Sequence, residues 1–227
     1  MMKISNGVKA ISLIVIVLFI DQLVKIEIKT TMTIGESITV FGNWFFIKFI
    51  ENPGMAFGLD IPGKQGKPIL TIFRIIAVVA IGWYLRELVI KGAKTGLVLC
   101  VALIFAGAMG NIIDSVFYGV IFNESTYFSV AQIFPKEGGY GHILHGRVVD
   151  MLYFPILQGT YPNWFPIWHG QEFIFFRPIF NIADSSISIG IISILLFQKS
   201  FFQHEEHVLT PVQEPGISSD QVTETEE

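Results

Sequence analysis

Carboxylates inside apolar sequence are the first feature of this chain that points to chemistry. Asp184 lies near the start of an apolar stretch at 178–197, which at roughly 20 residues is long enough to cross a bilayer as a helix. A carboxylate within such a helix costs roughly 2.5–3.5 kcal/mol on insertion scales, so its presence favours a functional role. Polar residues at helical spacing form a single stripe here: Asn181, Asp184, Ser185 and Ser188. The alternative is that the first turn of the helix frays and the Asp184 side chain extends to the membrane interface.

The other charged and amide side chains of the apolar stretches fall near the ends of those stretches. If the stretches cross the membrane alternately, one non-cytoplasmic face collects Asp21, Lys25, Arg74, Asn111, Asp114, Asp150, Asn181 and Asp184. Two aspartates that share a site do not both ionise easily, so one of them keeps a proton. The ionised carboxylate can take a proton from water while the protonated one polarises a carbonyl. This is the chemistry of peptide hydrolysis by an aspartic mechanism.

Some of these groups have a simpler interpretation as structural residues. Asp21 and Lys25 are four positions apart, the favourable orientation for a helix ion pair, so we expect them to hold the site rather than react. Asp114 shares a helix face with Gly107 and Gly110, small residues that permit close helix contact. Asp114 is either catalytic or a hydrogen-bonded carboxylate at a helix end, and the second interpretation is favoured.

Signatures of other hydrolases and of cofactor sites are missing from the sequence. The chain has no Gly-x-Ser-x-Gly, no His-Glu-x-x-His and no glycine loop of the phosphate-binding type. The remaining candidate metal ligands do not have a diagnostic spacing: His142, His145, His169 and Glu172. We therefore expect neither a metal nor another cofactor.

Composition indicates the class of protein. Of the 227 residues, 52% are hydrophobic and 15% are charged, and the mean hydropathy is +0.58. Four stretches have spanning length, at 11–28, 69–85, 97–114 and 178–197. The first resembles a signal peptide, but no small-residue cleavage site follows it, so we expect it to remain as the first span. The net charge of −4 argues against a nucleic-acid partner.

The expected fold is an all-α membrane protein with four transmembrane helices, a small extracytoplasmic β-hairpin and an interfacial loop segment. The membrane domain covers 1–202, with outer loops at 29–68 and 115–177 and with both termini cytoplasmic, as the Lys and Arg bias suggests. Strand-forming residues at 36–40 and 44–50 flank a Gly-Asn turn and predict the hairpin. We expect an irregular lid at 116–146, an aromatic interfacial segment at 153–176 and a disordered acidic tail at 203–227.

Five short motifs, in order along the chain, resemble those of the lipoprotein signal peptidases, the type II signal peptidases of the bacterial cytoplasmic membrane. They are Asp21-x-x-x-Lys25, Asn52-x-Gly54-x-Ala56-Phe57, Gly110-Asn111-x-x-Asp114, Val148-Val149-Asp150 and Phe180-Asn181-x-Ala183-Asp184. The resemblance implies a membrane aspartic endopeptidase whose catalytic residues are Asp150 and Asp184, with the hairpin as a membrane-resting cradle. It also implies cleavage of diacylglyceryl-modified prolipoproteins just before the lipidated cysteine, and inhibition by cyclic peptides of the globomycin type. The residues expected to bind substrate or support the site are Asp21, Lys25, Asn52, Gly54, Asn111, Asp114, Arg147, Asn181 and Ala183.

Two departures from the family pattern concern geometry. The family usually has Arg directly after the aspartate of the third motif, whereas this chain has Ser115, and the 116–146 segment is longer than expected. Asp114 would then need another cation, and Arg147 is the nearest candidate in the loop that carries Asp150. In an extended chain Arg147 and Asp150 point to opposite faces, which would let Arg147 reach Asp114. The alternative is a solvent-exposed arginine in a mobile loop.

Two other functional classes could use or tolerate the same residues. A small proton-coupled transporter would bind and release protons at these carboxylates, and a scaffold protein would need no reactive group. Transporters often place ionisable groups near the bilayer midplane, between internal repeats. Here the groups gather at one face and no internal repeat is visible, which favours the peptidase. The expected partners are therefore lipid-modified prolipoproteins and membrane lipid.

Overall fold

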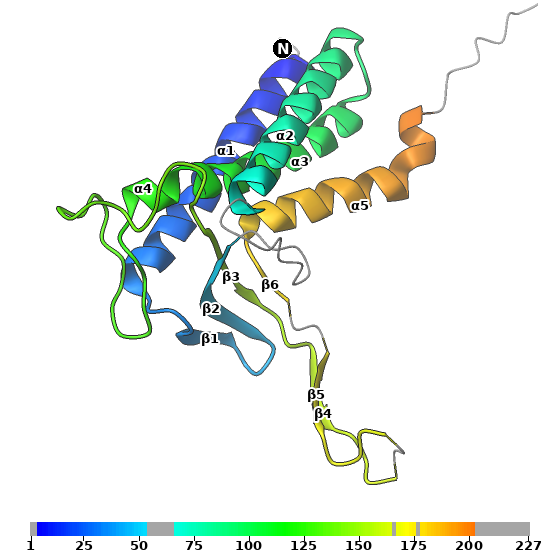
Figure 1. Ribbon diagram of the computed structural model, residues 1–227. Coiled ribbons are helices and arrows are strands. Elements are labelled where there is room, and N and C mark those ends of the chain that lie inside the picture. The colour runs from blue at the N-terminus through cyan, green and yellow to red at the C-terminus, as the bar shows by residue number, and fades with distance from the viewer. Residues whose placement is uncertain (1–3, 54–65, 165–166, 176–177, 203–227) are drawn as a thin grey trace, which may run out of the picture.

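Long apolar helices form the body of the protein. The computed structural model describes residues 4–53, 66–164, 167–175 and 178–202, and Figure 1 shows how its elements are arranged. The long helices are α1 (Asn6–Thr31), α2 (Gly66–Ile90), α3 (Thr95–Ile113) and α5 (Ile182–Phe202). Four helices of the described chain are long and apolar enough to cross a membrane, which confirms the predicted number of spans.

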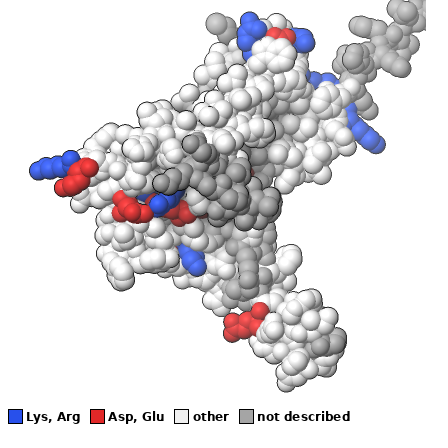
Figure 2. Space-filling model, in the orientation of Figure 1, with Lys and Arg blue, Asp and Glu red and all other residues white. Residues whose placement is uncertain are grey.

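Helix α3 lies at the centre and packs against α1, α2 and α5. Small residues make the contact with α5 close, because a Cβ added at Gly107 would lie 2.2 Å from the carbonyl oxygen of Ala183. The outer faces of the helices expose large apolar side chains such as Phe19, Phe73 and Leu196. On the face drawn in Figure 2, charged atoms gather at the end of the bundle and around the loops beside the sheet. This distribution fits helices whose sides are covered by lipid.

The third helix ends later than predicted. It continues through one π-helical turn, η1 (Asp114–Tyr118), into a last turn, α4 (Gly119–Ile121), so the first residues of the predicted irregular lid are helical. A π turn leaves carbonyl groups in need of partners, and the N–H of Gly146 donates to the Ser115 carbonyl at 2.9 Å. No side chain fits at Gly146, because its Cβ would lie 1.9 Å from the Asp114 carbonyl oxygen.

The fourth span begins later than predicted. Helix α5 starts at Ile182, and Ile179–Phe180 form strand β6 where the sequence suggested a first helical turn. The side chain of Asn181 ends the strand and starts the helix, since its Oδ1 accepts the backbone N–H of Asp184 at 2.9 Å. Asparagine competes for nearby backbone groups and therefore favours such a cap over a position inside a helix.

A four-stranded antiparallel sheet lies beside the ends of α1 and α3 (Figure 1). Its strands are β1 (Ser37–Phe41), β2 (Phe45–Asn52), β3 (Val148–Tyr153) and β6, in the order β1-β2-β3-β6. The predicted hairpin is confirmed as β1 and β2, and its turn contains Gly42 at φ +47°, where glycine is favoured. Strands β3 and β6 were not predicted. They place Asp150 in the same sheet as the hairpin and Asn181 directly after the edge strand β6.

A hydrophobic core joins one face of this sheet to α1 and to the end of α3. Its buried residues are Ile28, Met32, Phe49, Tyr118, Phe122, Ala131, Val149 and Met151. Successive side chains of a strand point to opposite faces. Because Val149 and Met151 point into the core, Asp150 between them points to the other face of β3.

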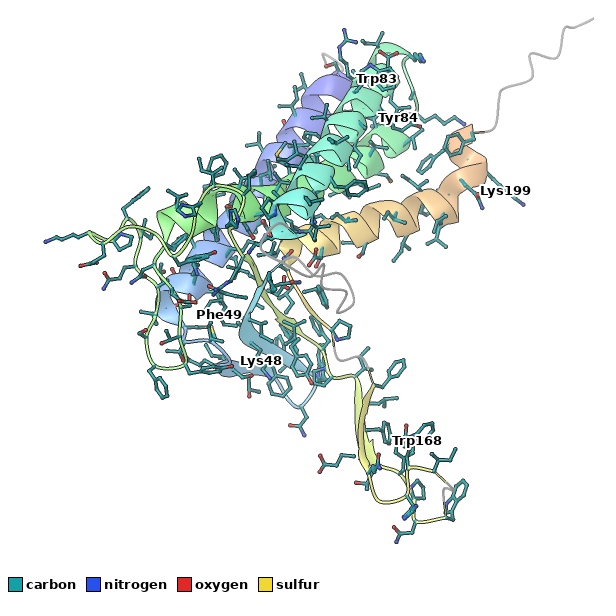
Figure 3. The ribbon with its side chains drawn as sticks, in the orientation of Figure 1. Lys48, Phe49, Trp83, Tyr84, Trp168 and Lys199 are labelled. Carbon is teal, nitrogen blue, oxygen red and sulfur yellow. The ribbon has the colours of Figure 1, made fainter. Side chains whose placement is uncertain are left out.

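A second, two-stranded hairpin consists of β4 (Leu157–Thr160) and β5 (Glu172–Phe175). It extends away from the helices, with Trp168 near its far end (Figures 1 and 3). The sequence predicted the aromatic character of this segment but not its strands. Its location in the membrane interface remains a prediction, as does the cytoplasmic position of the termini. The predicted disordered tail at 203–227 lies outside the described residues.

Candidate active site

Asp150 and Asp184 approach each other from different elements. Asp150 lies in β3, only 4% exposed, and Asp184 lies in the first turn of α5. Asn181 donates from Nδ2 to Asp150 Oδ1 at 2.7 Å, and Asn52 donates from Nδ2 to Asp150 Oδ2 at 3.3 Å. The carboxylate of Asp184 acts electrostatically on Asp150. The structure therefore brings the two predicted catalytic aspartates into one site.

Asn181 joins the strand, the helix and both aspartates. Besides the cap on Asp184, its own backbone N–H donates to Asp184 Oδ2 at 3.3 Å, so the two residues form a reciprocal capping box. Its Nδ2 also lies 3.1 Å from Asn111 Oδ1. An asparagine supplies a donor and an acceptor on one side chain, which explains its use at this junction. Asn181 is thus the residue through which Asp150 and Asp184 are held in register.

Lys25 orients the amide on the other side of Asp184. Its Nζ donates to Asn111 Oδ1 at 2.9 Å, and Asn111 Nδ2 donates to Asp184 Oδ1 at 2.8 Å. The same ammonium forms ion pairs with Asp21 at 2.9 Å and Asp114 at 2.8 Å, all three side chains being buried. The predicted Asp21–Lys25 ion pair is confirmed. Because Lys25 occupies the oxygen of Asn111, the NH₂ group must face Asp184.

Asp114 has the contacts expected of a structural carboxylate. In addition to Lys25, it accepts from Gln22 Nε2 at 2.9 Å and from the backbone N–H of Val149 at 3.4 Å. These bonds tie the end of α3 to α1 and to β3. Gln22 was not singled out in the sequence, although it lies directly after Asp21.

Asp21 also holds the start of α5. Its Oδ1 accepts the N–H of Ala183 at 2.9 Å, one of the amides that a helix N-terminus leaves without an internal partner. Ala183 is fully buried, and a Cβ added at Gly110 would lie 2.7 Å from Asp21 Oδ2 and 3.3 Å from the Ala183 Cβ. Small residues at these positions therefore let Asp21 reach α5. The remaining predicted site residue, Gly54, lies outside the described residues.

The predicted pairing of Arg147 with Asp114 is wrong. Arg147 forms ion pairs with Glu51 and Glu124, each at 3.0 Å. Glu51 in turn pairs with Lys29 of α1 and accepts from Ser125 at 2.9 Å. The cation of Asp114 is Lys25 instead, because α1 packs against α3 and brings the Lys25 ammonium to the Asp114 carboxylate.

Ser115 does not leave a gap where the family usually has arginine. Its side chain is 2% exposed and donates from Oγ to the Asn111 carbonyl at 2.8 Å. Lys25 supplies the cation of Asp114 instead, and the sequence signal was its position four residues after Asp21, on the same face of α1.

The carboxyl of Asp150 differs electrostatically from an ordinary surface aspartate. Burial, and then the nearby charge of Asp184, raise the pKa of Asp150 to about 7, against the opposing hydrogen bonds from Asn52 and Asn181. Burial alone would also raise the pKa of Glu51, but the ammonium of Lys29 holds that pKa below its usual value. Asp150 therefore keeps a proton at pH values where Glu51 is ionised.

A cavity of about 230 Å³ adjoins the site between α2, α3 and α5. Its lining residues are Arg74, Ala77, Val78, Ala108, Asn111, Ile112, Asp184 and Ile187. Arg74 was noticed in the sequence but was not predicted to be a site residue. Among the described residues, no group of three or more His, Cys, Asp or Glu side chains is arranged to hold a metal ion. The site can therefore supply carboxylic acids, amides and one guanidinium to a bound molecule.

Known proteins have similar sequences and folds. The model of the signal peptidase (SPase) II family matches residues 13–201. A lipoprotein signal peptidase of Porphyromonas gingivalis is 49% identical over 195 residues, covering 86% of this chain and 84% of that protein. One from Amoebophilus asiaticus is 35% identical over 187 residues, covering 81% and 75%. A bacterial membrane enzyme solved by the in meso method at 2.3 Å resolution has a TM-score of 0.57 at 29% identity, covering 92% of this chain and 99% of that one.

Proposed function

The chain belongs to the signal peptidase II family, and we propose that it is a membrane-embedded aspartic endopeptidase. Its substrates are diacylglyceryl-modified prolipoproteins, and it cuts just before the lipidated cysteine to remove the signal peptide. The observation that carries the aspartic mechanism is the hydrogen-bonded path from Asp150 through Asn181 and Asn111 to Asp184. The relatives give no support to a proton-coupled transporter.

The two aspartates have different surroundings, and these suggest their roles. Asp150 has a raised pKa of about 7, so it supplies the proton that polarises the scissile carbonyl. Asp184 lies at the N-terminus of α5, where the helix dipole favours negative charge, and both its oxygens accept hydrogen bonds. Asp184 is therefore the base that takes a proton from the attacking water.

The reaction then proceeds without a covalent intermediate on the protein. Water attacks the carbonyl carbon, its proton passes to Asp184, and the carbonyl oxygen is protonated by Asp150. In the tetrahedral intermediate, Asp184 returns its proton to the amide nitrogen of the cysteine while Asp150 recovers one from the hydroxyl. The C–N bond breaks, and the products are a carboxylic acid on the signal peptide and a free amine on the lipidated cysteine.

The depth of the site fits a substrate that is anchored in lipid. The dyad lies where the sheet meets the ends of α3 and α5, hence at one boundary of the spanning region. A cysteine whose acyl chains are in the bilayer is held at the same boundary. The Lys and Arg residues of the short loops favour cytoplasmic termini, and we therefore infer that this boundary is at the outer face of the bacterial cytoplasmic membrane. Globomycin-type cyclic peptides are expected to bind the same site.

The test is cleavage by the purified protein in lipid nanodiscs. We expect it to convert a diacylglyceryl-modified prolipoprotein to a signal peptide and a product that begins with the lipidated cysteine, both identified by mass spectrometry. The same precursor without lipid serves as the control and should stay intact, and globomycin should block the reaction. An intact lipidated precursor after prolonged incubation would reject the proposed function.

A further inference from the structure

Arg74 lies on the inner face of α2 and is not used by the mechanism above. Thr71 and Val78, one turn before and after it, are 2% and 4% exposed, whereas Phe73 and Ile76 are 67% and 62% exposed. Residues three and four apart share one face of a helix. These exposed fractions therefore indicate that Arg74 lies on the face of α2 that points toward α3 and away from lipid.

The cavity beside Arg74 has a polar end and an apolar end. Arg74, Asn111 and Asp184 line the end nearest the dyad. Helix directions place the other lining residues one turn deeper in the bundle: Ala77, Val78, Ala108 and Ile187. At about 30 Å³ per water, a volume of about 230 Å³ holds on the order of eight water-sized groups. That is room for a small polar group with a short apolar extension, and not for a pair of acyl chains.

An arginine at this depth needs a functional reason. A charged side chain inside a spanning helix costs roughly 2.5–3.5 kcal/mol on insertion scales. The guanidinium is close enough to Asp184 and Asp150 for their charges to act on it. Lys25 pairs with Asp21 and Asp114, on the other side of Asn111 from the cavity. Arg74 lines the cavity beside Asp184, so its guanidinium is presented to a molecule that enters there.

We propose that Arg74 is a substrate-binding residue whose guanidinium donates hydrogen bonds to carbonyl oxygens of the substrate beside the scissile bond. A guanidinium has five N–H donors and no acceptor, so neutral carbonyl oxygens are matching partners. Two parts of a prolipoprotein carry such oxygens at this depth. One is the glyceryl ester of the lipid, and the other is the C-terminal end of the signal helix, whose last carbonyls have no internal partner. The inference rests on the proposed function.

The experiment compares Arg74→Gln and Arg74→Lys with a matched control on the same helix. The control is Arg86→Gln, because the Arg86 side chain is 68% exposed and pairs with Glu87 at the surface. With the diester-lipid precursor, Arg74→Gln should lower kcat/KM by about ten- to a hundredfold, mainly through a higher KM. Arg74→Lys keeps the charge but loses the fork geometry, so its KM should rise less. Arg86→Gln should match the wild type.

A precursor carrying a dialkylglyceryl ether, which lacks the ester carbonyls, distinguishes the two sources. If the KM defect of Arg74→Gln disappears with the ether substrate, the ester is the ligand; if it persists, the ligand is the peptide carbonyls. An Arg74→Gln variant that matches Arg86→Gln on both substrates, or that lowers kcat without changing KM, would overturn the inference. If Arg74→Gln does not fold, an unchanged KM in Arg74→Lys would overturn it. Failure of the wild type to cleave would instead reject the proposed function.

Discussion

Replacing Lys25 by methionine should destabilise the protein and slow the reaction together. The Lys25 ammonium is fully buried and binds Asp21, Asp114 and Asn111 at 2.8–2.9 Å. Methionine has a similar length but no charge, so two buried carboxylates lose their cation. Removing one partner of a buried ion pair typically costs about 3–5 kcal/mol. For a chain of this size that corresponds to a fall in Tm of about 6–20 °C.

The effect on catalysis follows from Asn111. Without Lys25 as donor to its oxygen, the Asn111 amide is no longer fixed with its NH₂ group toward Asp184. Loss of one hydrogen bond to a charged group costs about 1.5–3 kcal/mol, so kcat should fall by about ten- to a hundredfold at temperatures where the variant is still folded.

Unfolding can be followed through the only cysteine of the chain. Cys100 is buried in α3 and is 8% exposed, so a thiol-reactive fluorophore labels it when the helices separate. The control for the loss of a lysine is Lys9→Met, because Lys9 is partly exposed and lies at the other end of α1 from Lys25. Adding Asp21→Asn and Asp114→Asn to Lys25→Met removes the unpaired charges and should recover part of the stability. A Lys25→Met variant with the Tm and rate of Lys9→Met would refute the reasoning.

Four further outcomes are expected. Because burial and Asp184 raise the pKa of Asp150 to about 7, kcat/KM should fall as the pH rises above about 7. The stabilisation from protonated Asp150 is complete below the unfolded pKa of about 3.9 and is lost as the pH rises through 7. Thermal melts should therefore show Asp150→Asn to be more stable than the wild type at pH 8 but not at pH 4. The asparagines that hydrogen-bond to the two aspartates are Asn52, Asn111 and Asn181. Alanine at each of these positions should slow cleavage by about one to two powers of ten. Unchanged kinetics in all three variants would show that the side chains only fill space. Trp164 and Trp168 should be quenched by shallow bilayer probes, whereas deep quenching would indicate an additional membrane element.

The spanning helices and the polar residues that gather at their ends could be predicted because their signals are local. Spanning length and hydropathy depend on composition alone, and the four-residue spacing of Asp21 and Lys25 is a property of one helix. The hairpin β1–β2 was likewise visible from its strand-forming residues and its Gly-Asn turn. These features involve residues that are close together in the sequence.

The parts that could not be predicted depend on contacts between distant segments. Strand β6 has only two residues, and it forms because β3 is already present as a partner for Ile179 and Phe180. The partner of Arg147 was misassigned for the same reason, since Glu51 lies 96 positions away. The sequence identified Asn181 as part of a polar stripe, whereas its function as a helix cap required the end of β6 to be known.

The central claim is that Asp150 and Asp184 act as an aspartic dyad, and cleavage by Asp150→Asn and Asp184→Asn tests it most directly. An amide keeps the volume of the side chain but can neither act as the base nor share the proton. Both variants should keep Cys100 protected from labelling. The control is Glu27→Gln on the exposed side of α1, which should also keep Cys100 protected and should cleave normally. Release of the signal peptide from a diacylglyceryl-modified prolipoprotein should fall by about 10²–10⁴-fold or more in each dyad variant. Near-wild-type release by either folded variant would contradict the account.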